Sequence, residues 1–128
     1  MNNRIRFERT AAGHARRVSD AHRVVGELLL ELGVAPHLVG YDPLCDGIRI
    51  ASEQDRTWAV QPAALNAAVE TLCDASNGEH AIRDAIGVGF LRPDDLHARI
   101  FPFSKRPSNS EFVCTLAELV RDRMDGMQ

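Results

Sequence analysis

Apolar residues recur every three or four positions over most of this chain, which is the period of an amphipathic helix. We expect a first helix from about Ala15 or Asp20 to Leu32, and Gly33 stands where it can end that helix. We expect a last helix over Glu111–Met124. The core-facing positions are Val24, Val25, Leu28, Leu29 and Leu32 in the first helix and Phe112, Val113, Leu116, Leu119 and Val120 in the last.

Two shorter segments follow the first helix. Pro36 should open a short helical stretch from His37 to about Tyr41. The next segment, Asp42–Ser52, is compatible with a helix that Gly47 weakens or with a short extended piece. The pattern alone favours neither alternative.

Two further segments precede the last helix. The sequence Arg92-Pro93-Asp94-Asp95 predicts a turn and a fresh helix start. Ile100–Phe103 should be extended, because Pro102 blocks a regular helix. The only tryptophan, Trp58, is expected to anchor the core.

A pair of helices around a sharp break occupies the middle of the chain, from Pro62 to Phe90. The first is alanine-rich and should begin at Pro62, whose missing N–H costs nothing in a first turn. Ser76 can cap the second, and Glu79 stands three residues later, at the spacing of a capping box. The core-facing positions of the second helix are Ala81, Ile82, Ala85, Ile86 and Phe90. Helix, short turn and helix over about residues 62–90 is the pattern of a helix-turn-helix.

Composition favours an all-α fold. Alanine and leucine supply most of the apolar side chains and only 5% of the residues are aromatic, which favours helices over a β-sandwich. The 128 residues suffice for one domain with a real core. We predict a flexible basic arm over residues 1–14 and, over residues 15–128, a single all-α domain of five or six helices that contains the helix-turn-helix.

Charge is unevenly distributed. The formal net charge of −3 is the opposite of the balance expected of a strong nucleic-acid binder. Up to Arg23, however, six arginines oppose two acids. This basic arm is compatible with contact to a phosphate backbone and with a solvated terminus, of which the second is the more frequent.

Other chemistry finds little support in the sequence. Cys45, Cys73 and Cys114 are widely spaced and form no CxxC pair, as expected of reduced thiols in a cytoplasmic protein. His37 and His97 have no second ligand at metal spacing, and no nucleophile stands with a base. We therefore expect no metal, no cofactor and no enzymatic activity. No apolar run is long enough to span a membrane.

Two runs of sequence resemble a known family. Residues 74–90 (DASNGEHAIRDAIGVGF) and 106–113 (RPSNSEFV) resemble the C-terminal effector domain of the sporulation-initiating response regulators. That family's ERAIRHAI-type helix corresponds to residues 79–86, and its KPTNSEF segment to residues 106–112. The segment LGVAPHLVGY, residues 32–41, is similar to the family's EIGVPAHIKGY. The likeness covers about residues 22–124.

The resemblance implies a six-helix DNA-binding domain that binds direct-repeat boxes in duplex DNA and contacts RNA polymerase. We expect it to bind DNA as a homodimer or as a tandem pair. The base contacts would come from Asn77, His80 and Arg83, because Asn pairs with adenine and Arg with guanine. Ser76 would contact a phosphate at the helix N-terminus. The loop residues that would hold the DNA backbone are Lys105, Arg106, Ser108 and Asn109.

The second helix departs from the family in its charges. Of the family's arginines only Arg83 remains, and Asp84 brings an acid to the exposed face. Arg83 can also form an ion pair with Glu79, four residues earlier. A second function therefore stays open, a helical interaction module that kept the fold, no longer reads DNA and binds RNA polymerase or another regulator.

Overall fold

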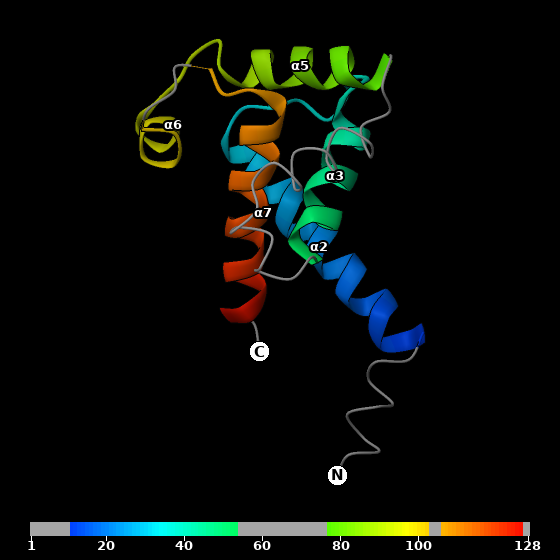
Figure 1. Ribbon diagram of the computed structural model, residues 1–128. Helices are drawn as coiled ribbons and strands as arrows, with labels where there is room; N and C mark the ends of the chain where they lie inside the picture. Colours follow the sequence, from blue (N-terminus) through cyan, green and yellow to red (C-terminus); the bar gives the residue numbers. More distant parts are fainter. Residues whose placement is uncertain (1–10, 54–76, 103–105, 127–128) are drawn as a thin grey trace.

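The computed structural model describes residues 11–53, 77–102 and 106–126, which form five helices and no strand. This confirms the all-α class. The helices are α2 (Ala11–Glu31), α3 (Tyr41–Glu53), α5 (Asn77–Gly89), α6 (Asp95–Ile100) and α7 (Asn109–Gly126). The packing of α3 on α7 is the most extensive, and α2 packs on both. α5 lies across one end of this bundle and α6 to one side, whereas α2 starts and α7 ends at the opposite end (Figure 1).

The core contains the apolar stripes that the sequence predicts. The predicted positions of α2 are all buried, as are those of α7 except Leu119, which packs against the core partly buried. α3 adds Leu44 and Ile48, and α5 adds Ile82 and Ile86. Burial of one such side chain contributes about 1.5–3 kcal/mol, so the stripes hold the four longer helices together.

Three phenylalanine rings lie where α5 and α6 meet the bundle. Phe101 and Phe112 stack with their ring centroids 5.5 Å apart, and Phe90 meets their rings edge to face at 5.6 and 6.3 Å. Edge-to-face and offset-stacked rings are the favoured aromatic arrangements. The cluster therefore fixes the end of α5 onto the start of α7.

α2 ends where Gly33 predicts. Gly33 has a φ of +82°, its N–H donates to the Leu30 carbonyl, and the N–H of Val34 donates to the Leu29 carbonyl. These two bonds form a Schellman motif, which satisfies the last carbonyls of the helix. The start of α2 differs from the prediction, because the helix already begins at Ala11.

The expected short helix from His37 to Tyr41 is wrong. The chain makes turns there, with bonds from Leu38 N to Ala35 O and from Tyr41 N to Leu38 O, and α3 begins at Tyr41. The reason is tertiary: the backbone at Gly40 packs against α5, so close that a Cβ on Gly40 would lie 2.0 Å from the Ala81 carbonyl oxygen. Residues 42–52, for which the sequence allows a helix or an extended segment, form a helix, and Gly47 is buried inside it.

The two later segments largely match the prediction. Asp94 caps α6 at the predicted turn, and α7 exceeds its predicted bounds by two residues at each end. Ile100 still belongs to α6, because the N–H of Phe101 donates to the His97 carbonyl and completes a helical turn before Pro102. The expectations for residues 1–10, Trp58, Cys73 and the first helix and turn of the helix-turn-helix, residues 62–76, lie outside the described residues.

Candidate nucleic-acid interface

α5 takes the place predicted for the second helix of the helix-turn-helix. It begins at Asn77, directly after Ser76, and ends at Gly89. Ile82, Ala85 and Ile86 are buried, which confirms the centre of the predicted stripe. Glu79 lies in the first turn, where a negative charge interacts favourably with the helix dipole.

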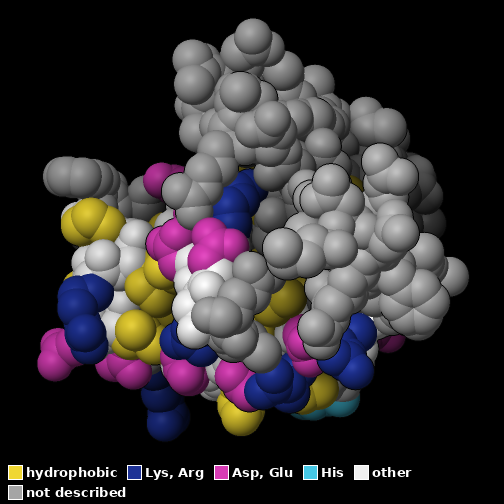
Figure 2. Space-filling model, turned by 90° about the horizontal axis from the view of Figure 1, so that it is seen from below, with side chains coloured by type: hydrophobic (Ala, Val, Ile, Leu, Met, Phe, Trp, Pro, Cys, Tyr) yellow, Lys and Arg dark blue, Asp and Glu magenta, His cyan; other side chains and the backbone are white. Residues whose placement is uncertain are grey.

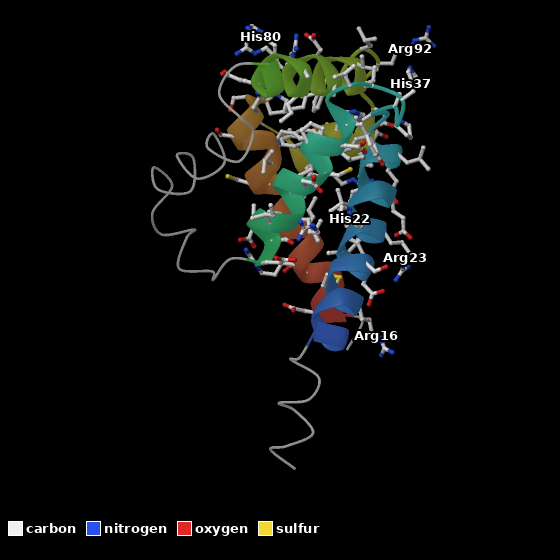
Figure 3. All side chains as sticks on the ribbon, turned by 90° about the vertical axis from the view of Figure 1, so that its right-hand side faces the viewer. Arg16, His22, Arg23, His37, His80 and Arg92 are labelled. Atoms are coloured by element: carbon white, nitrogen blue, oxygen red, sulfur yellow. The ribbon has the colours of Figure 1, made fainter. Side chains whose placement is uncertain are left out.

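The opposite side of α5 is exposed. We call it the outer face and define it by His80, Arg83 and Asp84, which are three and four residues apart and all exposed. His80 points away from the bundle near the start of α5, and Arg92 does so beyond its end (Figure 3). Arg92, for which the sequence predicts only a place in a turn, thus adds a cation to the same end of the molecule.

Arg83 forms the alternative contact that the sequence left open. Its Nη2 lies 3.1 Å from Oε1 of Glu79, and both side chains are about half exposed. An exposed pair of this spacing contributes only a few tenths of a kcal/mol. The pair therefore leaves Arg83 available to a stronger partner, although Glu79 partly neutralises it in the free protein.

The loop before α7 reaches back to α5. Arg106 Nη2 donates to the Arg83 carbonyl at 2.9 Å, and Asn109 Nδ2 donates to the Glu79 carbonyl at 3.0 Å. The structure thus brings two of the four predicted loop residues next to the predicted base-contacting helix. These bonds cannot be predicted from the sequence, because their acceptors are backbone groups.

The remaining predicted residues divide into two groups. Ser108 caps α7, since its Oγ accepts the N–H of Glu111 at 3.1 Å. Ser76 and Lys105 lie outside the described residues, and of Asn77 only its backbone position at the start of α5 is described.

Gly87 makes room for the Arg106 guanidinium. A Cβ on Gly87 would lie 2.7 Å from Nη2 and 3.0 Å from Cζ of Arg106. The sequence pattern marks this glycine only as a cost to helix stability of about 1 kcal/mol. Gly87 lies one turn after Arg83, and its lack of a side chain lets the Arg106 guanidinium come close to α5.

A buried histidine, His97, joins the ends of three helices. Its Nε2 lies 2.8 Å from the Gly89 carbonyl oxygen of α5 and 3.0 Å from the Leu32 carbonyl oxygen at the end of α2. Because a carbonyl only accepts, Nε2 carries a proton and donates to both. Nδ1 lies 2.9 Å from Oδ1 of Asp94, the cap of α6, and the ring meets Phe90 edge to face at 4.7 Å. With 5% exposure, this histidine belongs to the core.

The partners of His97 shift two pKa values. Burial acts to lower the pKa of His97, but the Asp94 carboxylate and the carbonyls of Gly89 and Leu32 outweigh it and raise the pKa above 6.5. The hydrogen bonds from the His97 side chain and backbone lower the pKa of Asp94 below 3.8. Both shifts favour the charged pair, so the junction of α2, α5 and α6 is sensitive to pH.

The end of the molecule opposite α5 has a different character. Figure 2 shows that basic and acidic side chains are interspersed over its described part. Several of the arginines form ion pairs, for example Arg23 with Glu27 at 3.6 Å and Arg123 with Glu31 at 3.4 Å. Interspersed, paired charges make a weak phosphate-binding surface.

Other kinds of site find no support in the residues that the structure describes. Among them no group of three or more His, Cys, Asp or Glu side chains could hold a metal ion. Cys45 and Cys114 are in no disulfide among the described residues, and burial raises the pKa of Cys45 to about 11. None of the described helices is both long and apolar enough to cross a lipid bilayer.

The fold and the outer face define an all-helical domain that presents one helix across the end of a bundle. Residues 25–120 match the family model described as Sporulation initiation factor Spo0A C terminal. The chain belongs to this family of DNA-binding, non-enzymatic transcription-activator domains. The match contains both sequence runs that carry the resemblance. No curated protein and no solved structure matched the chain.

Proposed function

We propose that this protein is a cytoplasmic transcriptional regulator that binds duplex DNA through α5. The observation that carries the proposal is the outer face: α5 buries its apolar stripe and turns His80 and Arg83 outward, in a family whose members bind DNA. A helix presented in this way fits the major groove, where Arg pairs with guanine. Arg92 would add a phosphate contact at the far end of α5.

The proposed DNA contacts fall into two sets. Asn77, His80 and Arg83 contact base edges, with Ser76 on a phosphate at the helix N-terminus. The loop set, which holds the DNA backbone, is Lys105, Arg106, Ser108 and Asn109. Two copies bind in tandem on direct repeats and contact RNA polymerase.

Fluorescence anisotropy tests the proposal. Labelled duplexes that carry one family box, two direct repeats of it or a scrambled sequence are titrated at about 50 and 200 mM salt. We expect submicromolar binding of the box, about tenfold tighter than the scrambled duplex, and two copies on the double site. Equal binding to both duplexes would contradict sequence reading by α5.

Two matched arginine variants sharpen this test. Arg83→Ala should cost about 1–3 kcal/mol of DNA binding free energy. Arg23→Ala is the control, because Arg23 is similarly exposed and also pairs with a glutamate, Glu27, but lies midway along α2, away from α5 (Figure 3). Equal losses in the two variants would mean that Arg83 contributes only general positive charge.

A second function is favoured by a different observation. Three large apolar side chains, Leu30, Val39 and Leu91, are 71–86% exposed. Together with Asp84 and the net charge of −3, they fit a domain that binds RNA polymerase or another regulator through protein contacts. Absence of binding to every duplex at low salt, with saturable binding of RNA polymerase, would favour this function over the first.

A further inference from the structure

The loop and α7 hold α5 through its backbone. The two acceptors, the carbonyls of Glu79 and Arg83, are four residues apart and therefore lie one turn apart along the same side of α5. Each accepts one intrahelical bond, and a carbonyl oxygen has a second lone pair to offer. Asn109 and Arg106 use these lone pairs, and we call the two residues the clamp.

The clamp residues lie at the start of α7, which is packed into the core. Asn109 is the first residue of α7, which Ser108 caps and which buries Phe112 completely in the core. Pro107, between the two clamp residues, is itself buried. The position of α5 is thus tied to the start of α7 over two successive turns.

One side of the clamp depends on a specific space. The Arg106 guanidinium lies over Gly87, where any larger residue would place its Cβ within 2.7 Å of Nη2. A planar guanidinium fits against such a surface, whereas an ammonium on a flexible stem is less constrained. Arg106 is therefore held by shape as well as by its bond to Arg83.

We propose that Arg106 and Asn109 are positioning residues, which set the rotation and depth of α5 and so act on DNA binding through α5. This inference rests on the proposed function and refines the role of two loop residues there. A phosphate contact contributes equally to every sequence and to the salt dependence of binding. A positioning residue instead affects the box more than the scrambled duplex.

Asn109→Ala separates these roles, with Ser110→Ala as the matched control in the same turn of α7. We expect Asn109→Ala to weaken binding to the box about fivefold, as for one lost hydrogen bond, while binding to the scrambled duplex stays unchanged. Equal weakening on both duplexes would identify a phosphate contact and overturn the inference.

Arg106→Lys provides the second variant, because it keeps the charge and loses the planar fork. We expect a loss of preference for the box at an unchanged salt slope. Full retention of that preference would show that only the charge of Arg106 matters and would overturn its positioning role.

Hydrogen exchange of the α5 amides in the free protein tests the clamp without DNA. Exchange over α5 should be faster in Asn109→Ala and Arg106→Lys than in Ser110→Ala, because local opening becomes easier. If wild-type protein binds no duplex but these differences remain, the proposed function fails and the clamp stands. Unchanged exchange in both variants would overturn the clamp itself.

Discussion

The Arg83 guanidinium lies 3.1 Å from the Glu79 carboxylate on α5. The only family arginine kept on the outer face is therefore paired with an acid of its own helix, and the carbonyl of each partner is bonded by the clamp. In the proposed complex, a DNA phosphate or guanine would compete with Glu79 for this arginine. We therefore expect Glu79 to lower the affinity for DNA.

This relationship predicts that Glu79→Gln strengthens DNA binding. Removing one negative charge beside the DNA should tighten binding to both duplexes by about fivefold, the size of one unit-charge interaction in water at close range. Anisotropy measures the change, and Glu27→Gln on α2 is the control. Weaker binding by Glu79→Gln would show instead that the ion pair orients Arg83 for its contact.

The His97–Asp94 pair predicts a stability optimum in mildly acidic solution. The pKa of His97 is raised, so its contribution is complete below 6.5 and is lost as pH rises through the pKa of the folded state. The pKa of Asp94 is lowered, so its contribution is present above 3.8 and is lost as pH falls through its folded value. Stability from this pair is therefore greatest between these two ordinary values.

Thermal unfolding at a series of pH values tests whether this contribution to stability is lost as the pH rises. We expect the melting temperature of wild type to fall between about pH 6 and pH 8 relative to His97→Gln, which cannot titrate. His37→Gln, at an exposed histidine, should keep the wild-type profile. A wild-type curve parallel to that of His97→Gln would contradict the raised pKa.

Two glycine substitutions should have opposite effects. Gly40→Ala would place its Cβ 2.0 Å from the Ala81 carbonyl oxygen, so α5 must move, at a cost of about 1–3 kcal/mol or more. Gly26→Ala in α2 meets only the Tyr41 hydroxyl at 3.5 Å and should gain up to about 1 kcal/mol of helix propensity. Denaturant unfolding measures the free energy of unfolding of the two variants, and equal values would refute the close approach at Gly40.

Ser108→Ala should lower stability and leave the DNA affinity of the folded protein unchanged. Loss of the α7 cap costs about 1 kcal/mol, or about 4 °C in melting temperature for a domain of this size. Calorimetry measures the shift, with Ser110→Ala as the control at a neighbouring serine. Weaker binding of folded Ser108→Ala to both duplexes would restore the phosphate contact predicted from the sequence.

Helix periodicity predicted most of the fold because it reports burial. The apolar stripes of α2, α5 and α7 face the core, and Gly33, Asp94 and Ser108 end or begin helices as local rules require. The short helix at residues 37–41 failed because contact with α5, far along the chain, decides that segment.

The candidate site was predictable in part. His80 and Arg83 could be placed on one face from their spacing alone. The bonds of Arg106 and Asn109 could not, since their acceptors are carbonyls that every helix contains. His97 looked like any isolated histidine, because its partners at Leu32 and Gly89 belong to distant helix ends.

Three side chains from outside α5, those of Arg106, Asn109 and His97, form hydrogen bonds to its main chain, at the carbonyls of Arg83, Glu79 and Gly89. Main-chain carbonyls are the same whatever residues a helix carries. Substitutions on the outer face of α5 therefore leave these hydrogen bonds in place, provided that Gly87 stays small. Under the proposed function, such substitutions would change the DNA sequence that α5 prefers while the fold stays the same.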